Sequence, residues 1–111
     1  MFLASEIVAR KYAKAYFRIH KQTLSDERIA QLRKMLTFCT TEKKLLSYLT
    51  IPSINTQTRQ LVIKKLIETF ELDDSLNNLL HLLIAHRRLE LIVPIIANIV
   101  RLHNEQRNII E

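Results

Sequence analysis

Hydrophobic positions recur every three or four residues along almost the whole chain, the spacing of amphipathic helices. Polar cap residues and a proline interrupt this pattern and divide it into six segments. The expected helices cover residues 5–21, from 25 past 39, from 41 to before Pro52, from 55 or 56 to 70, 75–86, and from 90 to beyond 107. The sequence therefore predicts an all-α fold, a compact bundle of about six helices in a single domain over residues 1–111.

The expected helix starts rest on side chains that can accept hydrogen bonds from free backbone N–H groups. They are Ser5, Ser25, Asn55 or Thr56, and Asp73 or Asp74. Pro94 is tolerated best in the first turn of the last helix, where no intrahelical N–H bond is lost.

Composition narrows the fold further. The chain has no glycine and two prolines, and 48% of its residues are hydrophobic. Without glycine, β-hairpin turns, P-loops and dinucleotide-binding turns are disfavoured together. The lone Cys39 lies on an apolar stripe and is expected to be a buried core thiol. No apolar run reaches the length of a membrane-spanning helix, and the N-terminal residues do not resemble a presequence.

The first expected helix has more apolar surface than one core requires. Its charged residues fall within about 100° of the helical wheel, whereas its apolar residues spread over about 200°. The charged residues are Arg10, Lys11, Lys14, Arg18 and Lys21. A helix packing on one core needs an apolar arc of roughly 100° or somewhat more. We therefore expect two packing partners, the domain's own core and a helix of another chain.

The fifth expected helix shows the same excess. Its core face is formed by Leu76, Leu79, Leu80, Leu83 and Ile84. Leu82 lies away from this face, among Ser75, Asn78 and His86. If the first and fifth helices lie side by side, their surplus apolar positions form a groove for an amphipathic helix.

Catalytic and charge features are sparse. The four histidines lack metal-binding spacing, and no serine, cysteine or lysine has a base placed beside it in the pattern. We expect no catalytic residue, metal or cofactor. The net charge of +6 favours acidic partners, although a solvated basic face also explains it. A basic helical nucleic-acid-binding module is the alternative function, but it leaves the two surplus apolar faces unexplained.

Two segments resemble the delta subunit of F-type ATP synthase, called the oligomycin-sensitivity-conferring protein in mitochondria. The first, Val8 to Phe17, reads VARKYAKAYF and is similar to the start of that family. The second, Asn78 to Leu89, reads NLLHLLIAHRRL and is followed by Leu91, Pro94 and Ile95. Family members often have Asn-Gly where this chain has His86-Arg87, so the tightness of the turn after the fifth helix is in question.

The resemblance implies a six-helix N-terminal domain on top of the catalytic head. Such a domain binds the N-terminal helix of an alpha subunit and is a non-catalytic stator component of the peripheral stalk, holding the head against rotor torque during proton-driven ATP synthesis. The family's C-terminal domain, which meets the b subunit, is absent from this chain. The implied location is the cytoplasmic side of a bacterial inner membrane, or its organelle equivalent, without membrane insertion or direct binding of nucleic acid.

The family's binding groove lies between its first and fifth helices, the two helices with surplus apolar surface. Carried over by position, the implied contact residues are Val8, Tyr12, Ala15, Ile19, Ser75, Asn78, Leu79, Leu82 and His86. Ala15 would keep the groove floor low, Tyr12 would offer a broad ring with a polar edge, and Asn78 could form a hydrogen bond at the rim.

Overall fold

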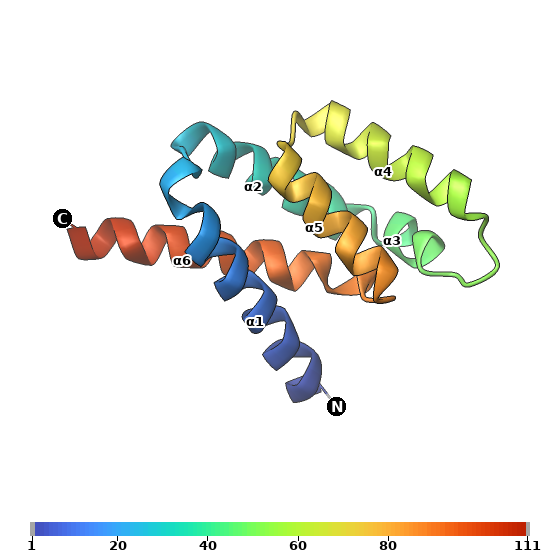
Figure 1. Ribbon diagram of the computed structural model, residues 1–111, viewed down its shortest axis with the longest axis horizontal. Helices are drawn as coiled ribbons and strands as arrows, with labels where there is room; N and C mark the ends of the chain where they lie inside the picture. Colours follow the sequence, from blue (N-terminus) through green and yellow to red (C-terminus); the bar gives the residue numbers. More distant parts are fainter. Residues whose placement is uncertain (1, 111) are drawn as a thin grey trace.

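A computed structural model describes the backbone of residues 2–110 and the side chains of residues 5–45 and 47–107. Within this range the chain forms six α-helices and two short 3₁₀ helices, with no strand (Figure 1). They are α1 (Phe2–His20), η1 (Lys21–Thr23), α2 (Asp26–Thr41), α3 (Lys43–Leu49), α4 (Thr56–Phe70), α5 (Asp74–Ala85), η2 (Leu89–Leu91) and α6 (Ile92–Ile110). The prediction of an all-α bundle is confirmed.

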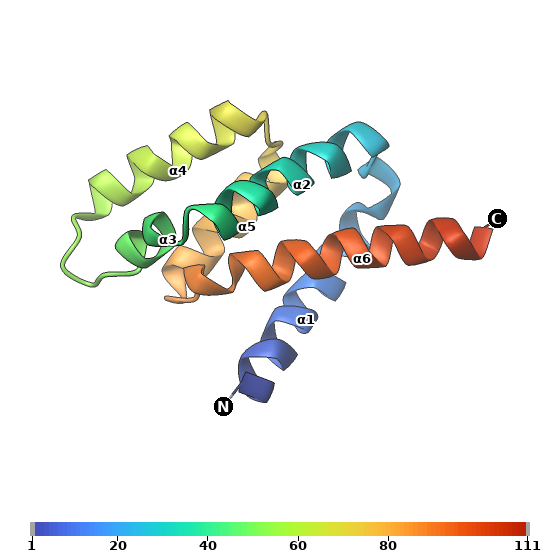
Figure 2. The ribbon, with the colours of Figure 1, turned by 180° about the vertical axis from the view of Figure 1, so that it is seen from behind.

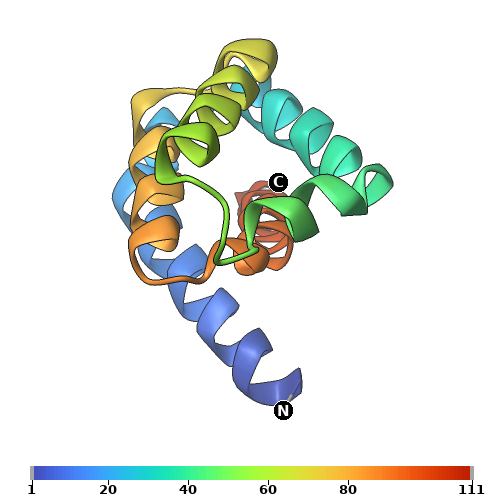
Figure 3. The same ribbon diagram turned by 90° about the vertical axis from the view of Figure 1, so that its right-hand side faces the viewer.

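Helix α6 is the centre of the bundle. Viewed along its axis, α6 has α5, α2 and α3 around it (Figure 3). Its inner face consists of isoleucines at the spacing of one helix face, and all are inaccessible to solvent. They are Ile92, Ile95, Ile96 and Ile99. These side chains join the buried leucines of α5 and the buried residues of α2 in one hydrophobic core.

Helix α1 makes its most extensive contact with α6, which it crosses on one side of the bundle (Figure 2). Ala9 and Ala13 are 0% exposed, and Tyr16 is buried on the same face one turn further on. The small alanine side chains allow the backbones of α1 and α6 to approach closely. The first and last helices of the bundle are therefore packed directly on each other.

Three predicted N-caps are present. The Ser25 hydroxyl accepts a hydrogen bond from the Arg28 N–H, and the Asn55 side-chain oxygen accepts one from the Gln57 N–H. Asp73 caps α5 by accepting the Leu76 N–H at 3.1 Å. These caps fix where α2, α4 and α5 begin, because each satisfies an N–H group that lacks a partner inside the helix.

Other predicted boundaries are wrong by a few residues. Helix α1 begins at Phe2, so Ser5 lies inside it, because no helix-breaking residue precedes Ser5. Helix α3 begins at Lys43 instead of residue 41. It ends at Leu49, ahead of the residue that Pro52 keeps out of the helical conformation. At the last connection a 3₁₀ turn comes first, so α6 begins at Ile92 with Pro94 in its first turn.

The turn after α5 is tight although it contains no glycine. Arg87 adopts the left-handed conformation with φ 55°. The Arg87 N–H donates to the Ile84 carbonyl at 3.1 Å, and the Arg88 N–H donates to the Leu83 carbonyl at 2.7 Å. This pair of bonds is a Schellman motif, which satisfies the free carbonyls at the helix end. A residue with a Cβ atom costs roughly 1–2 kcal/mol in this conformation, so the turn forms at some strain.

The prediction that Cys39 is a core thiol is confirmed, since the residue is 2% exposed. Burial raises the pKa of the Cys39 thiol, which lowers the fraction of reactive thiolate at neutral pH. We therefore expect a thiol-reactive dye to label the native protein far more slowly than the denatured protein. Labelling at equal rates in both states would show that Cys39 is accessible in solution.

Candidate functional site

Helix α1 carries an exposed strip beside its buried face. The strip contains the four predicted site residues of this helix, which span about 60° of the wheel. They are Val8, Tyr12, Ala15 and Ile19. Val8 and Tyr12 are half-buried, Ala15 is exposed, and Ile19 is 74% exposed. The strip is therefore only partly covered by the described residues, since Val8 and Tyr12 pack against the core whereas Ala15 and Ile19 are exposed.

Helix α5 carries a second strip, which is polar except for Leu82. Four of its five predicted site residues lie beside the buried leucine face, namely Ser75, Asn78, Leu82 and His86. Leu82 is 44% exposed, and Asn78 and His86 are exposed. The fifth, Leu79, is 7% exposed and belongs to the hydrophobic core, so it can contribute little more than a floor to any binding surface.

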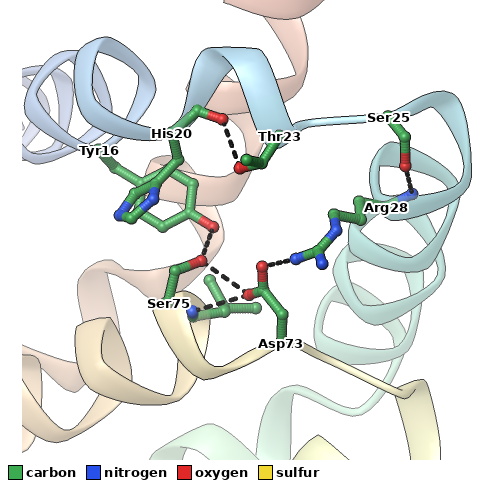
Figure 4. A network of polar contacts seen from close by, with 8 residues as sticks. Tyr16, His20, Thr23, Ser25, Arg28, Asp73 and Ser75 are labelled. Atoms are coloured by element: carbon green, nitrogen blue, oxygen red, sulfur yellow. Dashed lines mark hydrogen bonds and ion pairs between the residues drawn. The ribbon is translucent and has the colours of Figure 1, made fainter.

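A chain of polar contacts joins α1 to the start of α5 (Figure 4). Tyr16 Oη lies 2.7 Å from Ser75 Oγ, and Ser75 donates to Asp73 Oδ1, also at 2.7 Å. Because the Ser75 hydroxyl has one proton and gives it to Asp73, Tyr16 is the donor to Ser75. The other oxygen of Asp73 forms an ion pair with Arg28 of α2.

The phenol of Tyr16 remains protonated in this arrangement. Burial raises its pKa, and the hydrogen bond with Ser75 and the nearby Arg28 charge lower it in smaller measure. The Tyr16 contact therefore persists throughout the neutral pH range and ties three helices together at this end.

A second contact joins α1 to the residue that follows the turn at the other end of α5. Arg88 Nη1 donates to Tyr12 Oη at 3.3 Å, and its guanidinium carbon lies 6.0 Å from the centre of the Tyr12 ring. Tyr16 thus meets the start of α5 and Tyr12 meets the chain after its end, so α1 and α5 run in opposite directions. These links are side-chain contacts, because the backbone of α1 packs closely on α6 and not on α5. We call the two strips together the α1–α5 surface.

Sequence reasoning missed the residues that hold this surface together. In the sequence pattern, Tyr16 is one more apolar position of its helix, and Arg88 looks like an ordinary surface cation. Their partners lie 59 and 76 positions away along the chain, which no local pattern indicates. The only indication in the sequence was that Arg88 lies in the segment Asn78 to Leu89, which resembles the family.

An apolar hollow away from the α1–α5 surface was also missed. It lies among α2, α3 and α4 and is lined mainly by Phe38, Leu45, Leu61, Val62, Leu66 and Phe70. The rings of Phe38 and Phe70 are 5.4 Å apart at one wall. Leu61 is 67% exposed at its edge, which makes this residue a useful comparison for Leu82.

The described residues offer no cluster of histidine, cysteine or carboxylate side chains that could hold a metal ion. Nor does this part of the chain contain a helix long and apolar enough to cross a membrane. The features that stand out on the two strips are the exposed apolar side chains of Ile19 and Leu82, which suit protein binding.

Residues 8–111 match the family described as the ATP synthase delta (OSCP) subunit. The chain belongs to this family, which is one of non-catalytic subunits of the synthase. The family resemblance found in the sequence is confirmed.

The chain is similar to the ATP synthase subunit delta of Bacillus cytotoxicus, with 30% identity over 112 residues, covering 96% of this chain and 59% of that protein. The corresponding protein of Geobacillus sp. (strain WCH70) is 32% identical over 108 residues, with the same coverage. The chain thus spans about three-fifths of the length of these curated relatives. No solved structure matches the chain.

Proposed function

We propose that the chain is a non-catalytic stator component of an F-type ATP synthase and binds the N-terminal helix of an alpha subunit on the α1–α5 surface. The observation that supports the proposal is the exposure of Ile19 on α1 and of Leu82 on α5, two large apolar side chains on antiparallel helices. A surface of this shape suits an amphipathic helix, which places its own apolar stripe against both strips.

The residues of the α1–α5 surface suit different parts of this contact. Ile19 and Leu82 are exposed and large enough to act as apolar anchors on either side. Ala15 lies on the same strip as Ile19, and its small side chain lets a partner backbone approach. Burial would contribute about 25 cal/mol per Å² of apolar area. The cost of ordering the partner helix reduces this gain.

The proposed role is mechanical. The domain would hold the catalytic head against rotor torque, while the C-terminal domain that family members carry would meet the b subunit of the peripheral stalk. The complex would lie at the cytoplasmic side of a bacterial inner membrane. No chemical step is assigned to this chain, and neither membrane insertion nor nucleic-acid binding is part of the proposal.

Replacing Leu82 tests the proposed docking surface. Leu82→Ala should weaken binding of a synthetic peptide of the alpha subunit's N-terminal helix by about 1–3 kcal/mol, as expected for truncation of an interface anchor. Isothermal titration calorimetry measures the change. Leu61→Ala is the matched control, because it removes the same atoms from another exposed leucine, on α4. Equal binding by the two variants would place the partner helix elsewhere.

Nucleic-acid binding stays the alternative because of the chain's net charge of +6. It would appear as binding to duplex or single-stranded oligonucleotides that falls steeply with salt. The exposed Ile19 and Leu82 argue against it, since a nucleic-acid surface requires cations and stacking aromatic rings rather than exposed aliphatic side chains.

A further inference from the structure

The second sequence motif ends in Arg88-Leu89, a pair to which the proposed function gives no role. Leu89 is buried in the core, whereas Arg88 is exposed. The left-handed Arg87 turns the chain back, and the bond from the Arg88 N–H to the Leu83 carbonyl fixes the backbone there. The Arg88 side chain crosses from this fixed point to Tyr12 of α1.

Arg88 retains most of its hydrogen-bonding capacity in this position. A guanidinium has five N–H donors, and the phenol of Tyr12 accepts from one of them. The ion pairs within the described residues use the carboxylates of Asp26, Asp73 and Glu105, and none of them includes Arg88. The remaining donors therefore lie free at the edge of the α1–α5 surface.

The residues beside Arg88 and its partner Tyr12 include a further cation and no carboxylate of the α1–α5 surface. Lys11 precedes Tyr12 on α1 and lies about 40° from Ala15 on the helical wheel. His86, two residues before Arg88, is exposed on the strip of α5. The eight residues of the α1–α5 surface include no carboxylate. Glu90 lines a different hollow together with Arg87, and Arg88 is not among the residues that line it.

We propose that Arg88 binds a side-chain carboxylate of the partner helix, located at the edge of that helix's apolar stripe. The proposal rests on the proposed function and adds the chemistry of the partner and its register on the surface. A guanidinium matches a carboxylate with two parallel hydrogen bonds, a geometry that a lysine cannot reproduce. The contact with Tyr12 holds the guanidinium in place before binding and lowers the entropy lost on pairing.

The test uses the full chain and the synthetic peptide of the alpha subunit's N-terminal helix. Arg88→Gln should weaken binding about tenfold at low salt, with a smaller loss at high salt. Arg88→Lys should recover part of the loss, because it restores the charge but not the paired hydrogen bonds. Arg10→Gln is the matched control: it removes the same charge from the side of α1 away from the strip and should bind as the unaltered chain does.

Peptide variants identify the carboxylate. Each aspartate or glutamate of the peptide is changed in turn to its amide and titrated against the unaltered chain and Arg88→Gln. One amide variant of the peptide should bind the unaltered chain about tenfold more weakly than the original peptide does. The same variant and the original peptide should bind Arg88→Gln with equal affinity. The inference is overturned if, for every carboxylate, the affinity loss of the peptide variant adds to that of Arg88→Gln. It is also overturned if Arg88→Gln binds the peptide with unchanged affinity. Either result would leave the proposed function standing. If the unaltered chain does not bind the peptide at all, the proposed function fails and the inference with it.

Discussion

Ala15→Asp should abolish binding of the alpha-subunit peptide while leaving the domain folded. Ala15 is exposed on the strip of α1, so a carboxylate there is hydrated in the free protein. Docking of the partner helix's apolar stripe would remove that water, and the exposed Lys11 one turn earlier can offset the charge only in part. The loss should amount to about 3 kcal/mol, at the lower end of the cost of a buried charge that lacks a full partner. Calorimetric titration measures the affinity, and circular dichroism verifies that the helices persist.

Two outcomes would contradict this expectation in different ways. If Ala15→Asp melts the domain, Ala15 belongs to the core and the strip is misplaced. If the variant stays folded and binds the peptide at full strength, the partner helix docks on another face. Ala15→Ser separates charge from size, because it adds a small polar group and should reduce affinity far less.

Ala13→Asp, two residues earlier, should have the opposite profile. Ala13 is 0% exposed on the face of α1 that packs against α6. A carboxylate there has neither space nor a charge partner, and we expect a loss of about 3–5 kcal/mol of folding stability. Typical domains have only about 5–15 kcal/mol in total, so the variant should be largely or partly unfolded. Thermal unfolding followed by circular dichroism measures the loss.

The pH dependence of Ala13→Asp checks the cause. Burial raises the pKa of the introduced carboxyl in the folded state above its unfolded value, so protonation favours folding. The stability deficit should therefore be smaller in acid than at neutral pH. Ala13→Leu is the uncharged comparison, since overpacking costs about 1–3 kcal/mol with no such pH dependence. If Ala13→Asp unfolds at the same midpoint temperature as the unaltered chain, Ala13 does not lie in the α1–α6 contact.

Local chemistry explains which parts of this fold the sequence could predict. The caps at Ser25, Asn55 and Asp73 were recognisable because a cap depends on a side chain and backbone groups two or three residues away. The excess of apolar surface on α1 followed from helical periodicity alone, whereas the residues of its strip came from the family resemblance. Both inferences use interactions within a single element.

The remaining features depend on which elements meet in space. The link from Tyr16 to Ser75 and the link from Arg88 to Tyr12 join residues on separate elements, and periodicity carries no information about such pairs. Leu79 is a different case: periodicity placed it on the core face of α5, where it is buried, and only the family resemblance placed it among the binding residues. The left-handed Arg87 also escaped prediction, because glycine is the usual signal for that conformation.

The packing of α1 on α6 has a consequence for the order of folding. Helices α2 to α5 can form many of their contacts over short loops, whereas α1 and α6 must close almost the entire chain before their contact forms. Closing a longer loop costs more entropy, so docking of α1 is favoured late, once α6 already has its place in the core. The α1–α5 surface does not exist until α1 has docked. Partly folded chains therefore lack the surface altogether, and competence to bind arises together with the completed bundle.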